Sequence, residues 1–220
     1  MYEAAISLLN EIEQKGYTAY IIGGYPRDKY LGRKTTDIDI ATSMTKDVIE
    51  ETFEIISSYK ELGSFKIKYK DYIFEITTFR IEEEYLDKRR PSKIRYTKSF
   101  TEDLKRRDFI INALAIDKKG EYIDVLNAKK DLDNKIIRVI GNIEKKINED
   151  PLRIIRAIRF KIELNFKLDK DLEEYILNNK KLIEYVSDYH IKKEYDKLAE
   201  KNKLEFKKEL EKLTNRDILV

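Results

Sequence analysis

The spacing of apolar residues along the chain predicts helices and strands mixed over its first two thirds. Apolar side chains recur at helical spacing over residues 4–13, and Lys15-Gly16 ends that helix. A strand over residues 18–22 runs into Gly23-Gly24. The same patterns predict helices over 26–31, 44–53 and 101–107, and strands over 36–41, 64–69, 72–79, 113–116, 121–123 and 135–139, with a hairpin turn at Lys70-Asp71.

The pattern changes twice along the chain. Residues 80–100 are polar, charged and interrupted by Pro91, which is typical of a long mobile loop. After about Asn142 no strand signal remains, and helical periodicity predicts helices over 149–164, 170–178, 182–185 and 188–213. We therefore expect an α+β domain over residues 1–141 and a helical domain with a short C-terminal extension over residues 142–220.

Composition limits the possible chemistry. Hydrophobic residues make up 41% of the 220 residues, enough for a folded core. The net charge is only +3, but basic runs at 88–90 and 105–107 can meet phosphates, although a solvated face is the commoner explanation. The chain has no cysteine and one histidine, so a metal site should use hard oxygen ligands. No apolar run approaches the ~18 residues of a membrane span, and the N-terminus lacks a signal-peptide pattern, which predicts a cytoplasmic protein.

Three short segments carry candidate chemistry. Asp37 and Asp39 stand two apart in the predicted strand, so both carboxylates would project from one face and could converge on two hard cations. Gly23-Gly24 lies between a strand and a helix, where backbone amides favour a phosphate. Glu75 in the hairpin is a possible third carboxylate. The alternative for the two aspartates is an exposed strand face, for the two glycines an ordinary tight turn, and for Glu75 a solvent-facing strand residue.

Several segments together resemble one family, the class II tRNA nucleotidyltransferases and bacterial poly(A) polymerases of the DNA polymerase β superfamily. The first match joins Gly23-Gly24-Tyr25-Pro26-Arg27-Asp28, Leu31-Gly32-Arg33 and Asp37-Ile38-Asp39-Ile40-Ala41-Thr42 into the head-domain signature. The others follow in the family's order: residues 74–80, 87–91, 106–109 with 112–113, 149–153 with 156–157 and 159–160, and a weaker match from residue 190 to 198. The sequence departs from the family pattern at Pro26, Ile110 and Asn148.

The resemblance implies a DNA polymerase β-like head, with a small mixed or antiparallel sheet flanked by helices, followed by an all-α neck. It implies Mg²⁺-dependent addition of C and A to the 3′ end of tRNA from CTP and ATP, with release of pyrophosphate. Asp37 and Asp39 would hold Mg²⁺ and, with Glu75, form the catalytic group. The nucleotide-binding residues would be Gly23, Gly24 and Arg27 for phosphates, Arg107, Asp108 and Asn112 for ribose, and Asp150, Arg153, Arg156 and Arg159 in the base-template helix. Asp87, Arg89 and Arg90 would belong to a flexible loop.

Asp150 and Arg153 suit the choice of A and C. Three residues apart on the predicted helix, they would share one face. A carboxylate only accepts hydrogen bonds and a guanidinium only donates them. Adenine and cytosine each offer an exocyclic amine donor beside a ring-nitrogen acceptor, whereas guanine and uracil reverse both. A helix cap and a local salt bridge are the structural alternative, and it is compatible with base reading.

Three other functions stay open. They are addition of A alone to tRNA, poly(A) synthesis, and RNA binding without catalysis. The intact loop motif over 87–91 argues against a CC-only enzyme, and Leu62-Gly63-Ser64-Phe65 resembles the CCA-adding pattern more than that of poly(A) polymerases. The matches stop near the end of the neck, as expected for either a compact form or a fragment of the family's head, neck, body and tail plan. The sequence leaves the oligomeric state open.

Overall fold

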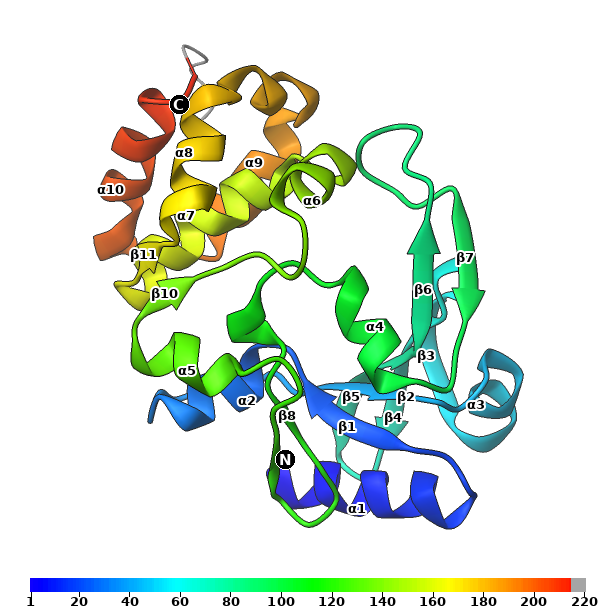
Figure 1. Cartoon of the computed structure of the whole chain (residues 1–220). Coiled ribbons are helices and arrows are strands. Elements are labelled where there is room, and N and C mark those ends of the chain that lie inside the picture. The colour runs from blue at the N-terminus through cyan, green and yellow to red at the C-terminus, as the bar shows by residue number, and fades with distance from the viewer. Residues whose placement is uncertain (215–220) are drawn as a thin grey trace. The chain divides into compact units, whose positions relative to one another are not determined.

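The computed structural model describes residues 1–214 and forms two compact units (Figure 1). Unit 1 comprises residues 1–83 and 94–132, and unit 2 comprises residues 84–93 and the chain from Asp133 onward. The division by contacts thus falls near residue 132, while the functional boundary at residue 141 stays a prediction. The end of the predicted helical domain, residues 215–220, lies outside the described part.

Unit 1 begins with the predicted alternation of helix and strand. Helix α1 (Tyr2–Gln14) is amphipathic, and its Leu8, Leu9 and Ile12 are fully buried. Strand β1 (Ala19–Ile22), helix α2 (Gly24–Tyr30) and strand β2 (Asp39–Thr42) follow. The expected hairpin is also confirmed, as β4 (Ser64–Tyr69) and β5 (Tyr72–Thr78).

The strands of unit 1 form one mixed sheet. Its order is β3-β4-β5-β2-β1-β8-β9, where β2 and β5 are parallel and the other neighbours are antiparallel. This confirms the predicted small mixed sheet flanked by helices. The remaining elements of unit 1 are β3 (Glu54–Tyr59), β8 (Ala115–Ile116), β9 (Tyr122–Ile123), α3 (Lys46–Thr52), α4 (Phe100–Arg106), α5 (Ala128–Asp133), and the short turns η1 (Lys60–Leu62) and η2 (Ile110–Asn112).

The two faces of this sheet differ in polarity. Along β4 and β5, residues such as Ile67 and Phe74 are fully buried in a core shared with α1, whereas the intervening Lys66 and Glu75 are exposed. Asp39 lies between two buried isoleucines and directly opposite Glu75 in the β2–β5 register. Because strand side chains alternate, Asp39, Lys66 and Glu75 share the open face of the sheet.

Two expectations for unit 1 were wrong. The sequence pattern gave no strand over residues 54–59, where β3 pairs with β4 at the edge of the sheet. The long mobile loop predicted over residues 80–100 is shorter, because β6 (Arg80–Glu83) and β7 (Lys93–Tyr96) pair as a two-stranded ribbon. The connection between them, residues 84–92, contains the loop motif.

Unit 2 is mainly helical. Its core includes Ile154, Ile155 and Ile158 of α7, and the most extensive helix packing joins α7 to α10. Two expectations were wrong here. A short strand, β11, pairs with β10 in parallel, and the single helix expected over residues 188–213 is two helices, the first ending at Asp196 and the second beginning at Glu200. The elements are β10 (Ile136–Ile137), α6 (Ile143–Glu149), α7 (Leu152–Leu164), β11 (Lys167–Leu168), α8 (Lys170–Asn178), η3 (Lys180–Tyr185), α9 (Asp188–Asp196) and α10 (Glu200–Glu211).

A further correction concerns the helix predicted over residues 149–164. It is two helices, because α6 ends at Glu149 and α7 begins at Leu152. Pro151 disfavours the helical conformation for the residue before it, and Asp150 is extended, with φ −147° and ψ 93°. The argument that Asp150 and Arg153 share one helix face is therefore wrong.

Across residues 1–214, the helices are all too short or too polar to cross a lipid bilayer.

Candidate active site

A glycine turn joins β1 to α2 and lies against the side chain of Asp39. Gly23 has a φ of 77°, which residues with a side chain rarely adopt. A Cβ on Gly23 would also lie 3.0 Å from Oδ2 of Asp39. Both the backbone conformation and the lack of space for a Cβ therefore favour glycine at this position. The turn brings the start of α2 close to the Asp39 carboxylate.

Carboxylates gather where β2 begins. Asp39 is the first residue of β2 and pairs in register with Glu75, whose Oε1 accepts a hydrogen bond from Ser64 Oγ at 3.0 Å. Asp37 is exposed and precedes the strand. The strand predicted from residue 36 is thus wrong at its start, and alternation does not explain the orientation of Asp37.

The charges of Glu75 and Asp37 nevertheless act on Asp39. Burial is the main cause that raises the pKa of Asp39 to about 6, and the charges of Glu75 and Asp37 add to it. Arg107 and Lys66 act in the opposite direction. Negative charge is therefore crowded around Asp39, and a divalent cation would relieve that repulsion.

The carboxylates fit a cation that takes few ligands from the protein. Within the described residues 1–214, no group of three or more His, Asp or Glu side chains is arranged to hold a metal by itself. Mg²⁺ commonly binds through one or two carboxylates together with substrate phosphates and water. Asp37 and Asp39 offer hard oxygen ligands of that kind.

Arg27, a predicted phosphate ligand, is buried on the inner side of α2. Its Nε and Nη2 donate to the two carboxylate oxygens of Asp28, and its Nη1 donates to Asn112 Oδ1 at 2.7 Å. The side chain thus ties α2 to the η2 turn. Through these hydrogen bonds Arg27 holds the glycine turn in position.

The predicted ribose-binding residues lie at the end of α4 and the start of η2. Asp108 Oδ1 accepts hydrogen bonds from the Phe109 backbone and from Asn112 Nδ2. Arg107 donates from Nε and Nη2 to one oxygen of Asp103, at 3.1 and 2.7 Å. The structure therefore joins Asp108 to Asn112 by a hydrogen bond, while Arg107 is held by Asp103 and the charge of Asp108 acts on it.

Asp103 was missed by the sequence interpretation. It is fully buried and accepts hydrogen bonds from Arg106, Arg107 and the backbone amide of Arg80. The available signal was its spacing, three and four residues before Arg106 and Arg107 on one helix. It orients Arg107 and anchors α4 to β6.

In unit 2, Asp150 and Arg153 have different partners. Arg153 is 5% exposed and donates to the carbonyl of Lys146 and to Glu149. Asp150 accepts two 3.0 Å hydrogen bonds from Nη1 of Arg89 in the 84–92 connection. The structure brings the loop motif to Asp150 rather than pairing Asp150 with Arg153.

The other predicted residues of unit 2 are also engaged. Arg159 and Arg156 of α7 both pair with Glu194 of α9, at 2.6 and 3.7 Å. In the loop motif, Asp87 Oδ1 accepts hydrogen bonds from the backbone amides of Arg89 and Arg90. This carboxylate shapes the turn that presents Arg89.

The sequence matches one domain family, the Poly A polymerase head domain, over residues 19–138. That range is more than half of the chain and includes the glycine turn, the three carboxylates and Arg107. The chain belongs to this family. The resemblance to class II tRNA nucleotidyltransferases and bacterial poly(A) polymerases is thereby confirmed.

This head-domain chain is similar to several known proteins. The CCA-adding enzyme of Bacillus velezensis is 40% identical over 197 residues, which are 89% of this chain and 50% of that protein. A crystal structure of the Bacillus stearothermophilus CCA-adding enzyme in complex with CTP has a TM-score of 0.80 and 36% identity, covering 88% of this chain and 47% of that one. A tRNA nucleotidyltransferase complexed with a primer tRNA and an incoming ATP analog has a TM-score of 0.73 and 29% identity, covering 93% and 59%. The chain spans about half the length of the curated relatives that it matches.

Proposed function

We propose that the protein is a nucleotidyltransferase that adds C and A to the 3′ end of tRNA from CTP and ATP. The observation that carries the proposal is the pairing of Asp39 with Glu75 beside the Gly23 turn, with Asp37 two residues away. The relatives named CCA-adding enzyme support the choice of reaction. A tRNA substrate also implies a cytoplasmic location.

In the proposed reaction the RNA 3′-hydroxyl attacks the α-phosphorus of the nucleoside triphosphate, and pyrophosphate leaves. Asp37 and Asp39 would hold Mg²⁺, with Glu75 as the adjacent catalytic carboxylate. When bound, the metal would lower the pKa of the hydroxyl and neutralise triphosphate charge. The Gly23-Gly24 amides would receive the phosphates, while Arg27 keeps that turn in position through Asp28 and Asn112.

The remaining residues would recognise the nucleotide. Arg107, held by Asp103, and the Asp108–Asn112 pair would contact the ribose, whose 2′-hydroxyl distinguishes a ribonucleotide. Asp150 and Arg153 would read the base edge, with Arg156 and Arg159 supporting α7. Base reading requires Asp150 to exchange its bonds with Arg89 for bonds to an exocyclic amine.

One experiment separates this function from its alternatives. The purified protein is incubated with tRNA ending before C, after C or after CC, each labelled nucleoside triphosphate is supplied with Mg²⁺, and product length is measured. Ordered addition of C, C and A supports the proposal. A alone, or a long A tract, would identify an A-adding enzyme or a poly(A) polymerase, and no product in any reaction would identify an RNA-binding protein.

The loop motif offers a test of nucleotide switching. Replacing residues 84–92 by a two-residue Asn-Gly turn keeps β6 and β7 paired while removing Arg89 from Asp150. We expect A addition to fall at least about tenfold more than C addition, which is about 1.4 kcal/mol, because the family loop helps the site to accept ATP. The measurement is kcat/KM for each nucleotide on tRNA ending before C or after CC. Equal losses would make the segment a structural brace.

Base choice has its own test. Asp150→Asn replaces one carboxylate acceptor by an amide donor, which should lower kcat/KM for ATP and CTP by roughly ten- to a hundredfold and relax discrimination against UTP and GTP. The control is Arg89→Ala, which also breaks the Arg89–Asp150 pair but leaves the carboxylate, so discrimination against UTP and GTP should persist. If both variants kept the wild-type ratios, base selection would lie outside Asp150.

A further inference from the structure

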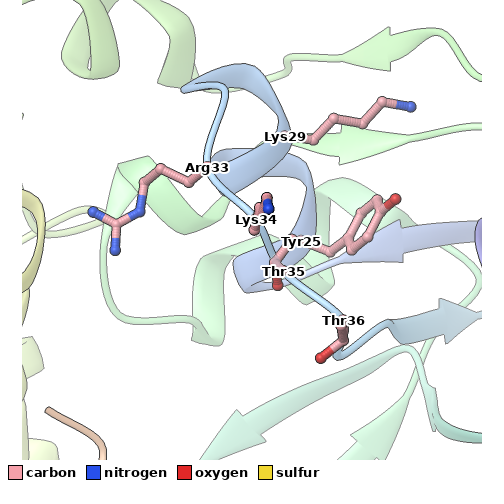
Figure 2. Close-up of a pocket in the computed structure, with 6 residues that line it drawn as sticks. All are labelled: Tyr25, Lys29, Arg33, Lys34, Thr35 and Thr36. Carbon is pink, nitrogen blue, oxygen red and sulfur yellow. The ribbon is translucent and has the colours of Figure 1, made fainter. Parts of the chain in front are cut away.

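A basic pocket lies on unit 1 beside the carboxylates, formed by α2 and the segment that leads to Asp37. It has a volume of about 500 Å³ and is lined by Tyr25, Lys29, Arg33, Lys34, Thr35 and Thr36 (Figure 2). None of these lining residues is acidic, and three of them carry a positive charge. This concentration contrasts with the whole chain, where 45 basic residues nearly balance 42 acidic ones.

The charged side chains are spread out rather than aimed at one point. Figure 2 shows Lys29 and Arg33 extending to opposite sides of the segment, with Lys34 between them. Lys29 and Lys34 are exposed, and Arg33 keeps a 39% exposed side chain although it pairs with Asp28 at 3.6 Å. A compact anion needs converging donors, whereas a chain of phosphates is matched by cations spread along its path.

Aromatic contacts hold part of this surface in place. Lys29 Nζ lies 3.6 Å from the ring centroid of Tyr2, and Tyr2 stacks on Tyr25 with ring centroids 5.8 Å apart. Burial raises the pKa of Tyr25, so its hydroxyl stays a neutral hydrogen-bond donor. The charges of Lys29 and Tyr25 also act on Tyr122, and Lys129 lies 5.0 Å from the ring of Tyr122.

The position of the pocket indicates which polyanion it meets. Thr36, a lining residue, directly precedes Asp37, the exposed carboxylate proposed to hold a cation at the reactive end of the RNA. Asp28 pairs with Arg27 and Arg33, and the charge of Glu3 acts on Tyr25. The charge of Asp37 would be balanced by the cation that it is proposed to hold. A strand whose 3′ end lies at Asp37 can therefore pass its backbone over this surface with little repulsion.

We propose that this pocket is an RNA subsite, in which Lys29, Lys34 and Arg33 bind successive backbone phosphates of the substrate upstream of its 3′ end. The inference rests on the proposed function and adds to it a binding site outside the catalytic carboxylates. Such contacts carry no base information and act through charge. They should therefore strengthen RNA binding and leave the choice of nucleotide unchanged.

The test is binding of fluorescein-labelled tRNA lacking its CCA end, measured by anisotropy from 50 to 300 mM NaCl. The double variant Lys29→Gln/Lys34→Gln should raise Kd about tenfold or more near 150 mM salt and reduce the slope of log K against log salt by roughly one to two. The charge-preserving variant Lys29→Arg/Lys34→Arg should restore most of the binding. Lys15→Gln, an exposed lysine at the far end of α1 from Tyr2, should behave as wild type.

Kinetics on the same proteins distinguish the possible sources of phosphate. At saturating tRNA, the double glutamine variant should keep kcat and the KM for CTP. A raised KM for CTP with unchanged tRNA binding would assign the pocket to the triphosphate, and an unchanged Kd and salt slope would show that no phosphate binds there. Both results overturn the proposal. Wild-type protein that binds tRNA but does not extend it would reject the proposed function alone, whereas wild-type protein that binds no tRNA would reject both.

Discussion

Asp39→Ala is expected to lower kcat for nucleotide addition by about a thousandfold or more, because it removes roughly 4 kcal/mol of metal-mediated transition-state stabilisation. Asp39 starts β2, pairs in register with Glu75 and lies against the Gly23 turn. Among the carboxylates of residues 1–214, Asp39 alone has that combination of neighbours. The measurement is single-turnover addition of C to tRNA in Mg²⁺, and EDTA should abolish wild-type activity as well.

The fold should not suffer from this change. The raised pKa of Asp39 means that its ionisation opposes folding, so its contribution to stability falls as the pH rises from 3.8 to about 6. In EDTA at pH 7, Asp39→Asn should therefore keep or raise the melting temperature. Undiminished extension by Asp39→Ala would overturn the metal assignment. A melting temperature of the Asp39 variants below that of the wild type would show that their lost activity reflects unfolding.

Asp103→Ala is expected to lower the free energy of unfolding by about 3–5 kcal/mol, because it removes the carboxylate that binds the largely buried Arg107 and takes from Arg106 its 2.8 Å pair, while a longer 3.5 Å pair to Glu82 remains. Asp103 is 0% exposed and bonds to Arg106, Arg107 and the Arg80 amide. The loss is a large fraction of the roughly 5–15 kcal/mol that stabilises a typical domain. Urea unfolding followed by circular dichroism measures it.

The neighbouring Glu102 supplies the control. It pairs with Lys105 at the surface of the same helix, so Glu102→Ala should cost at most about 1 kcal/mol. Burial by itself raises the pKa of Asp103, but Arg107 and Arg106 outweigh it and hold the pKa below its ordinary value. The stability that Asp103 contributes is therefore present above about pH 4 and is lost as the pH falls further. Equal losses for the Asp103 and Glu102 variants would contradict this role.

The sequence determined the elements whose cause is local. The apolar stripe of α1 and the alternation of β4 and β5 need no information from distant residues. The motifs also identified the family and the Gly23, Asp39 and Glu75 segments, because the chemistry requires those residue types in that order. Asp150 could have been placed correctly too, since Pro151 disfavours a helical residue before it.

Only the tertiary structure decided which distant residues meet. The parallel pairing of β2 with β5 sets Asp39 opposite Glu75, and two-residue periodicity alone cannot specify a register between strands that lie 36 residues apart. The pairing of Arg89 with Asp150 depends likewise on chain segments 61 residues apart. β3 escaped detection because an edge strand needs one paired neighbour and no continuous apolar pattern. Residue types and local order come from sequence, whereas partners depend on the packing of the whole fold.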